Sequence, residues 1–250
     1  MAAPQPLFSS AGRAALKALV AAPAVHAFDY DGTLAPIVAR PADATMPAGI
    51  ARRLQSLAQR VPTAVISGRG RDDVSPRVPS AVRWIVGNHG NEGGVRAADD
   101  ARAVVADWVA QIGRDPAVPP LLAAGAMVED KGLSLSLHYR LARSPAQAAD
   151  VLQALAARLS PAPRIIGGKR VLNLMPPQSH TKFDALADLV EAAGACSALF
   201  VGDDETDEEL FSRAPPHWVT VRVQRVRGSC ARFFVHEQPQ LAMLLDFLLQ

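Results

Sequence analysis

The sequence has few cysteines, little excess charge and no long hydrophobic run. Only Cys196 and Cys230 occur among 250 residues. They do not form a metal-spaced cluster, and so few cysteines indicate either a reducing compartment or a fold that is indifferent to the redox state of its compartment. A formal net charge of +2 provides no field that would attract nucleic acid or an anionic membrane. Because no apolar run reaches membrane-spanning length, we expect neither a nucleic-acid partner nor a membrane partner.

The first 24 residues also lack the pattern of a secretion signal. Arg13 and Lys17 lie among Ala and Leu residues, and no apolar core leads to a cleavage site. This stretch therefore predicts a leading helix, and we expect a cytoplasmic protein. Nothing in the sequence indicates an oligomeric state.

What the chain does have is the composition of a globular protein, 49% hydrophobic and 20% charged. Apolar strands alternate with amphipathic helices, and polar or Gly-rich loops follow the strands. This rhythm predicts an α/β fold, a Rossmann-like parallel sheet flanked by helices. The expected strands are 24–28, 61–66, 82–86, 198–201 and 218–223, and the expected helices are 10–20, 47–60, 181–193 and 238–249.

Between these parts the pattern changes to α+β. Helices are expected over 99–112 and 144–159, and hairpins over 126–140 and 164–174. The sequence therefore predicts an inserted α+β cap domain, 91–175, within a catalytic core formed by 1–90 and 176–250.

The most informative segment runs from Phe28 to Leu34 and contains Asp29, Asp31 and Gly32. Ligands of open α/β sheets bind at the carboxyl ends of the strands, where both carboxylates are expected. Like charges this close raise each other's pKa. A bound divalent cation would relieve the repulsion, and one carboxylate could then act as a nucleophile. A simple turn is the alternative, because Asp and Gly are common turn residues.

Other polar groups are expected at the same edge of the sheet. Ser67 and Gly68 follow the second strand, Lys182 begins a helix, and Asp203 and Asp207 follow a later strand. Each has a simpler interpretation as a helix cap or a surface charge. Together they favour Mg²⁺, which prefers oxygen ligands, beside a phosphoryl group held by Ser67, backbone N–H groups and Lys182.

These residues resemble the four motifs of the haloacid dehalogenase superfamily of phosphatases, in the same order. Within that superfamily the sequence is similar to the trehalose-6-phosphate phosphatase family over nearly the whole chain. The further segments that carry this similarity are 67–69, 88–90, 129–131, 138–140, 168–169 and 176–182. The resemblance implies a Mg²⁺-dependent phosphatase that converts trehalose 6-phosphate to trehalose and phosphate.

The resemblance also implies a role for each catalytic residue. Asp29 would form an aspartyl-phosphate, and Asp31 would protonate the leaving sugar and then activate water. Ser67 and Lys182 would hold the phosphate. The metal site would comprise Asp29, Asp31 through its backbone carbonyl, Asp203 and Asp207, with Asp207 holding a metal-bound water or positioning Lys182.

Substrate binding is implied for Gly68, Arg69 and His89 in the core and for Glu129, Lys131 and Asn173 in the cap, which would act as a lid. One position departs from the family pattern, because Asn173 stands where Glu is usual. Another sugar phosphate is therefore an alternative substrate. A phosphate-binding module without turnover is a further alternative, which the intact catalytic set disfavours.

Overall fold

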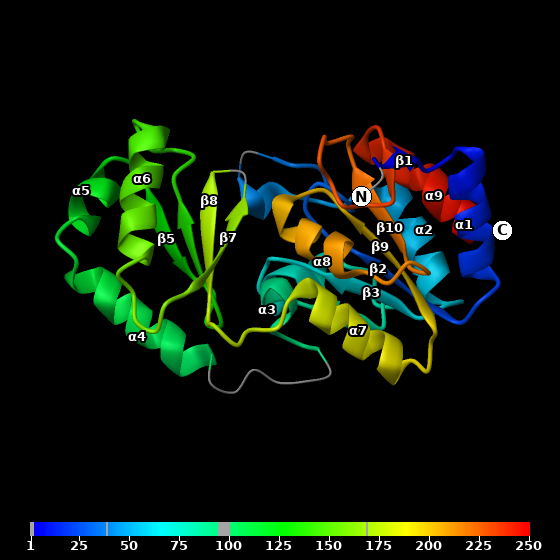
Figure 1. Ribbon diagram of the computed structural model, residues 1–250, viewed down its shortest axis with the longest axis horizontal. Helices are drawn as coiled ribbons and strands as arrows, with labels where there is room; N and C mark the ends of the chain where they lie inside the picture. Colours follow the sequence, from blue (N-terminus) through cyan, green and yellow to red (C-terminus); the bar gives the residue numbers. More distant parts are fainter. Residues whose placement is uncertain (1–2, 39, 95–100, 169) are drawn as a thin grey trace. The chain divides into compact units, whose positions relative to one another are not determined.

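The computed structural model describes residues 3–38, 40–94, 101–168 and 170–250. The chain divides into two compact units, Met1–Arg96 with His180–Gln250, and Ala97–Ser179. Most of their helices and strands are labelled in Figure 1. Within the described parts of the chain, each helix is too short or too polar to cross a lipid bilayer.

The first unit is built on a seven-stranded sheet in the order β1-β11-β10-β9-β2-β3-β4. Every neighbouring pair in it is parallel. All the carboxyl ends of its strands therefore lie at one edge. The strands are β1 (Gln5–Pro6), β2 (Ala24–Phe28), β3 (Thr63–Ile66), β4 (Trp84–Val86), β9 (Ser197–Gly202), β10 (Val219–Val223) and β11 (Phe233–Val235).

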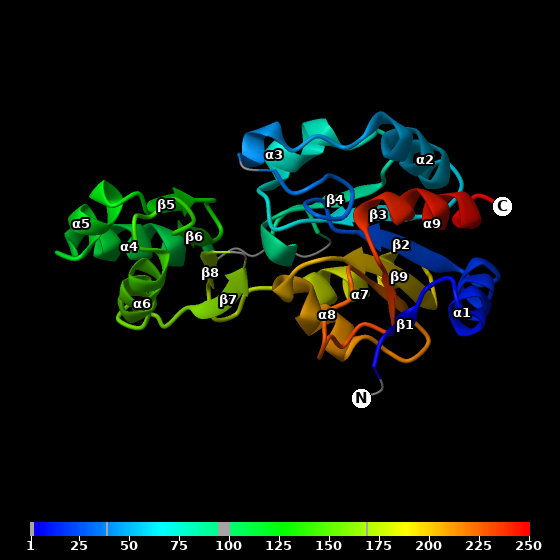
Figure 2. The same ribbon diagram turned by 90° about the horizontal axis from the view of Figure 1, so that it is seen from above.

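Helices cover both faces of this sheet, which explains why its strands are largely apolar. Residues of α1 (Ser10–Val20), α2 (Ala48–Ala58) and α9 (Leu241–Leu248) share one core cluster with the sheet. Residues of α7 (Lys182–Ala192) and α8 (Glu208–Arg213) form another. Figure 2 shows α2 and α9 on the opposite side of the sheet from α7 and α8. A short helix, α3 (Arg71–Val74), follows β3.

The second unit contains a four-stranded antiparallel sheet in the order β5-β6-β8-β7. Its strands are β5 (Met127–Asp130), β6 (Leu135–His138), β7 (Arg164–Gly168) and β8 (Val171–Met175), and its helices are α4 (Ala101–Arg114), α5 (Val118–Ala123) and α6 (Pro145–Ala156). Alternate residues of β6 and β8, including Leu135, Leu137 and Leu172, pack on these helices around Trp108. The opposite face of the sheet carries the polar residues of the same strands.

The predicted α/β fold, a parallel sheet with an inserted α+β segment, is confirmed. The strands β1 and β11 and the helix α5 were not predicted. The start of the helix expected at Asp99, and Lys169 in the second hairpin turn, lie outside the described residues.

Candidate active site

The nucleophile segment leaves β2 at the carboxyl edge of the sheet. The backbone N–H of Asp29 still donates to the carbonyl of Val201 on β9, at 2.8 Å. Gly32 then turns the chain with φ of 78°, a conformation that favours glycine. A Cβ atom at Gly32 would also collide with the carboxylate of Asp203. The glycine therefore lets two acidic loops approach each other.

Lys182 lies at the first turn of α7, where the helix dipole disfavours a cation. A capping box fixes that turn, because the side chains of Thr181 and Asp184 each accept a hydrogen bond from the other's backbone N–H. The Lys182 ammonium is buried and donates to Asp29 Oδ1 at 2.8 Å and to Asp207 Oδ1 at 2.7 Å. These two carboxylates compensate for both the dipole and the desolvation of the charge.

The same contacts determine the protonation of the lysine. Burial alone would lower the pKa of Lys182, but Asp207 and Asp29 outweigh it and hold the pKa well above its ordinary value. Lys182 therefore stays a cation and can attract a phosphate.

Three buried carboxylates, those of Asp29, Asp203 and Asp207, gather around this lysine. One oxygen from each lies within 4.8 Å of the others. Burial, together with the charges of Asp207 and Asp203, raises the pKa of Asp29 in spite of Lys182. Three carboxylates and one ammonium leave a formal charge of −2, which a divalent cation would balance. The all-oxygen donor set fits Mg²⁺.

A buried arginine that the sequence reasoning missed supports the acidic loop. Arg222 on β10 donates to the backbone carbonyls of Asp203 at 2.8 Å and Asp204 at 3.0 Å, and it pairs with Glu208. Within the same loop, the backbone N–H of Asp204 donates to Asp207 Oδ2 at 3.0 Å. A single charged residue in the otherwise uncharged strand VTVRV was the available signal.

Ser67 and Gly68 lie in a turn at the end of β3. The hydroxyl of Ser67 accepts the backbone N–H of Arg69 at 3.1 Å, and its carbonyl accepts the N–H of His89 at 3.0 Å. The His89 ring packs so close to Gly68 that a Cβ there would collide with it. Gly90 in turn lies against the carbonyl of Thr181. The predicted residues Ser67, Gly68 and His89 are thus assembled next to the start of α7.

Asp31 is not part of the acidic cluster. Both of its carboxylate oxygens accept hydrogen bonds from Arg69, at 2.6 Å from Nε and 2.7 Å from Nη2. The Arg69 side chain is 9% exposed, and that of Asp31 is 34% exposed. Burial would lower the pKa of Arg69, but Asp31 and Asp73 outweigh it and raise the pKa. Asp31 and Arg69, predicted as separate site residues, form one ion pair.

The predicted cap residues share one face of the second unit's sheet. Glu129 Oε2 lies at hydrogen-bond distance from His138 Nε2, 2.7 Å, and Lys131 Nζ lies 4.0 Å from the same carboxylate oxygen. Asn173 pairs across the strands with Ser136, whose hydroxyl donates to Asn173 Oδ1 at 2.7 Å. These side chains form a continuous row of hydrogen-bonding groups.

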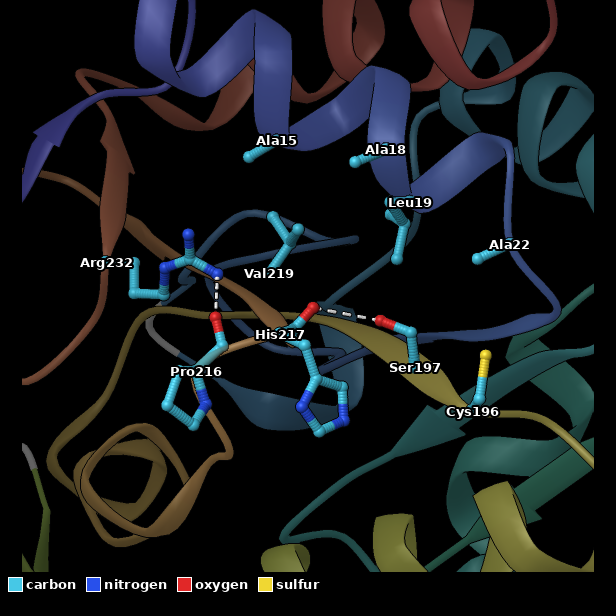
Figure 3. A pocket seen from close by; sticks show the side chains of 10 residues that line it. All are labelled: Ala15, Ala18, Leu19, Ala22, Cys196, Ser197, Pro216, His217, Val219 and Arg232. Carbon is cyan, nitrogen blue, oxygen red and sulfur yellow. Dashed lines mark hydrogen bonds between the residues drawn. The ribbon is translucent and has the colours of Figure 1, made fainter.

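A cavity of about 460 Å³ lies at the other edge of the seven-stranded sheet. Figure 3 shows it between α1 and the amino ends of β9 and β10, with Leu19, Ser197 and Val219 in its wall. The acidic cluster lies at the opposite edge, after the carboxyl ends of β2 and β9. This cavity is therefore separate from the predicted site.

Comparisons with known protein sequences agree with this arrangement. A sequence model of the family described as trehalose-phosphatase matches residues 27–238. A trehalose-phosphate phosphatase from Mycobacterium tuberculosis is 31% identical over 239 residues, which are 90% of this chain and 61% of that protein. An uncharacterized glycosyl hydrolase from M. tuberculosis is 36% identical over 202 residues, 76% of this chain but 15% of that protein. The chain thus spans less than two thirds of the length of each of these relatives.

Solved structures show the same fold. The C-terminal domain of C. albicans trehalose-6-phosphate phosphatase aligns with a TM-score of 0.75 and 20% identity, over 100% of this chain and 99% of that one. A subclass IIB sugar phosphatase of the HAD superfamily aligns with a TM-score of 0.59 and 11% identity, over 90% of this chain and 99% of that one. The predicted haloacid dehalogenase fold is confirmed.

Proposed function

The chain belongs to the trehalose-phosphatase family, and from this premise we propose that it hydrolyses trehalose 6-phosphate to trehalose and phosphate. The observation that carries the proposal is the buried ammonium of Lys182 between Asp29 and Asp207, with Asp203 completing a cluster of charge −2. Such a buried, oxygen-rich cluster suits phosphoryl transfer, which depends on positioning and charge neutralisation.

Asp29 is the proposed nucleophile, attacking phosphorus to form an aspartyl-phosphate. Its buried position at the end of β2 keeps bulk water from the reacting carboxylate. Asp31 would donate a proton to the leaving sugar oxygen and then accept one from the water that cleaves the intermediate. Lys182, Ser67 and the N–H groups after Gly68 would hold the phosphoryl oxygens.

Mg²⁺ is the proposed cofactor, held by Asp29, Asp203 and the backbone carbonyl of Asp31. When bound, it would neutralise the carboxylates and the phosphoryl charge. Both oxygens of Asp207 accept hydrogen bonds, from Lys182 and from the Asp204 N–H. This favours the positioning of Lys182 as the role of Asp207.

The sugar would be recognised by the polar face of the second unit's sheet, through Glu129, Lys131 and Asn173. A different sugar phosphate is the second candidate substrate, and one observation favours it. The Asn173 carboxamide accepts from Ser136 and donates to the Ile166 carbonyl at 3.4 Å. This residue is a neutral amide, already partly engaged, where the family usually has a carboxylate.

Phosphate release from a panel of sugar phosphates tests the proposal. We expect trehalose 6-phosphate to give the highest kcat/KM, with glucose 6-phosphate and mannose 6-phosphate well below it. EDTA should abolish release and added Mg²⁺ should restore it. A different preferred sugar would support the second candidate, and release that persists in EDTA would remove the metal from the mechanism.

A further inference from the structure

Arg69 lies in a chain of alternating charges that begins at Asp31 and ends outside the catalytic cluster. Its Nη1 donates to Asp73 Oδ2 at 2.6 Å, and Asp73 Oδ1 accepts from Arg77 Nη2 at 2.9 Å. Arg77 Nη1 in turn donates to the backbone carbonyls of Ala42 and Ala44, each at 3.1 Å. The four side chains therefore connect the nucleophile loop with α3 and with the segment 41–44.

The donors of Arg69 are nearly all used inside the protein. Nε and Nη2 bind Asp31, Nη1 binds Asp73, and Nη2 also donates to the Pro41 carbonyl at 2.7 Å. Four of the five guanidinium N–H groups are thus engaged. The guanidinium carbon also lies 5.6 Å from the centroid of the Tyr30 ring. Little hydrogen-bonding capacity of the Arg69 guanidinium therefore remains for a phosphate or a sugar.

Asp31, by contrast, keeps hydrogen-bonding capacity. A carboxylate has about four lone-pair sites, and Arg69 occupies two of them in a fork that fixes the carboxylate plane. The remaining sites on this partly exposed side chain can meet a substrate oxygen. Since a proton-transfer group must lie within hydrogen-bond reach of its target, the orientation of this plane matters for the reaction.

We propose that Asp73 and Arg69 are positioning residues, which act on the proposed phosphatase reaction by fixing the carboxylate of Asp31 and not by binding the substrate. Asp73 is the decisive link, because its two oxygens hold the guanidinium groups of Arg69 and Arg77 together. The inference rests on the proposed function and adds to it a residue outside the catalytic cluster.

The neighbouring residue provides a matched control. Asp72 lies on the same short helix as Asp73 and is exposed, and within the described parts of the chain it makes no ion pair or side-chain hydrogen bond. Asp72→Asn and Asp73→Asn therefore remove the same charge from the same helix. Of the two substitutions, Asp73→Asn alone removes the carboxylate that pairs with Arg69.

Steady-state kinetics with trehalose 6-phosphate separates positioning from binding. Asp73→Asn should lower kcat about fivefold to tenfold with KM nearly unchanged, since a misplaced group slows the reaction without weakening binding. Asp73→Glu should restore most of the loss, and Asp72→Asn should leave both constants within about twofold of wild type. Higher KM at unchanged kcat, unchanged constants or faster turnover in Asp73→Asn would each overturn the proposal.

NMR of the arginine side chains tests the same link without substrate. In the wild type, rotation about the Arg69 Nε–Cζ bond should be much slower than in exposed Arg52. It should accelerate in Asp73→Asn and not in Asp72→Asn. Fast rotation in the wild type would overturn the proposal even in a protein that releases no phosphate. Slow rotation without any phosphatase activity would instead reject the proposed function while leaving the ion-pair chain intact.

Discussion

At the scale of single residues, Asp29 is the carboxylate on which the proposed mechanism depends most. We predict that Asp29→Asn lowers the rate of phosphate release at least about 10³-fold, because an amide cannot act as the nucleophile. The fold should persist, since Asn is nearly isosteric and Lys182 keeps its contact with Asp207. Phosphate release and thermal unfolding measured on the same sample check both parts.

Ser67→Ala is the informative comparison for this variant. The Ser67 hydroxyl accepts one backbone N–H in the structure, and its proposed role is to hold a phosphoryl oxygen. Its loss should therefore cost far less activity than the loss of Asp29. Release near the wild-type rate in Asp29→Asn would reject Asp29 as the nucleophile.

For His26 we predict an effect on stability that is independent of catalysis. It is buried on β2, and burial lowers its pKa from 6.5 to about 4. Between these values the unfolded chain binds a proton that the folded chain does not, so stability falls as the pH decreases from about 6.5 to about 4. At pH 5 the free energy of unfolding should be lower by about 2 kcal/mol than at neutral pH through this one group.

Urea unfolding at pH 7.5 and pH 5 measures this effect. His26→Met should lose less stability than the wild type on acidification, because it has no imidazole to protonate. His217→Met, at an exposed histidine, should behave like the wild type. An equal loss in all three proteins would show that His26 does not control the acid side of the stability curve.

At the scale of elements, the hairpin of β5 and β6 carries two of the proposed sugar contacts, Glu129 and Lys131. We predict that Lys131→Ala lowers kcat/KM on trehalose 6-phosphate by about 10²-fold or more, because sugar hydroxyls would lose a charged partner. The loss on p-nitrophenyl phosphate, which has no sugar, should be small. Parallel assays of the two substrates measure the difference.

Arg114→Ala is the control, since Arg114 is an exposed cation at the end of α4 in the same unit. It should leave both substrates unaffected. Equal losses on both substrates in Lys131→Ala would mean that the hairpin supports the catalytic core, and the proposed specificity would be rejected.

The elements that the sequence predicted are those with a local signal. The strand β2 is an apolar run broken only by His26, and Asp29 and Gly32 follow it closely, so its position and its chemistry can both be read from residues 24–32. The strands β1 and β11 pair with each other and β11 with β10. β1 has two residues and β11 three, too short for periodicity to reveal.

The candidate site likewise combines residues that a local motif indicates with contacts that no local signal indicates. Asp29, Lys182 and Asp203 were found because each lies in a recognisable motif at an element's end. The pairing of Asp31 with Arg69 joins residues 38 positions apart, and the support of the Asp203 loop by Arg222 joins residues 19 apart. Nothing in the local sequence specifies these contacts, because they arise from the parallel order of the strands.

At the scale of the whole molecule, each compact unit has its own hydrophobic core. The cluster around Trp108 draws only on residues between 104 and 174, and the two clusters on the seven-stranded sheet draw on none of them. Burial of apolar side chains is the main stabilising term in a domain. The units should therefore respond separately to the loss of a core residue.

Leu137→Ala in the second unit and Leu199→Ala in the first test this separation. Both leucines are fully buried strand residues, and each truncation should cost about 2–5 kcal/mol within its own unit. In hydrogen exchange followed by mass spectrometry, Leu137→Ala should reduce protection in peptides from 101–168, while peptides covering β2 and β9 keep theirs. Leu199→Ala should produce the converse. If either variant lowered protection equally in both units, the two cores would unfold as one cooperative structure, and the prediction of separate responses would be wrong.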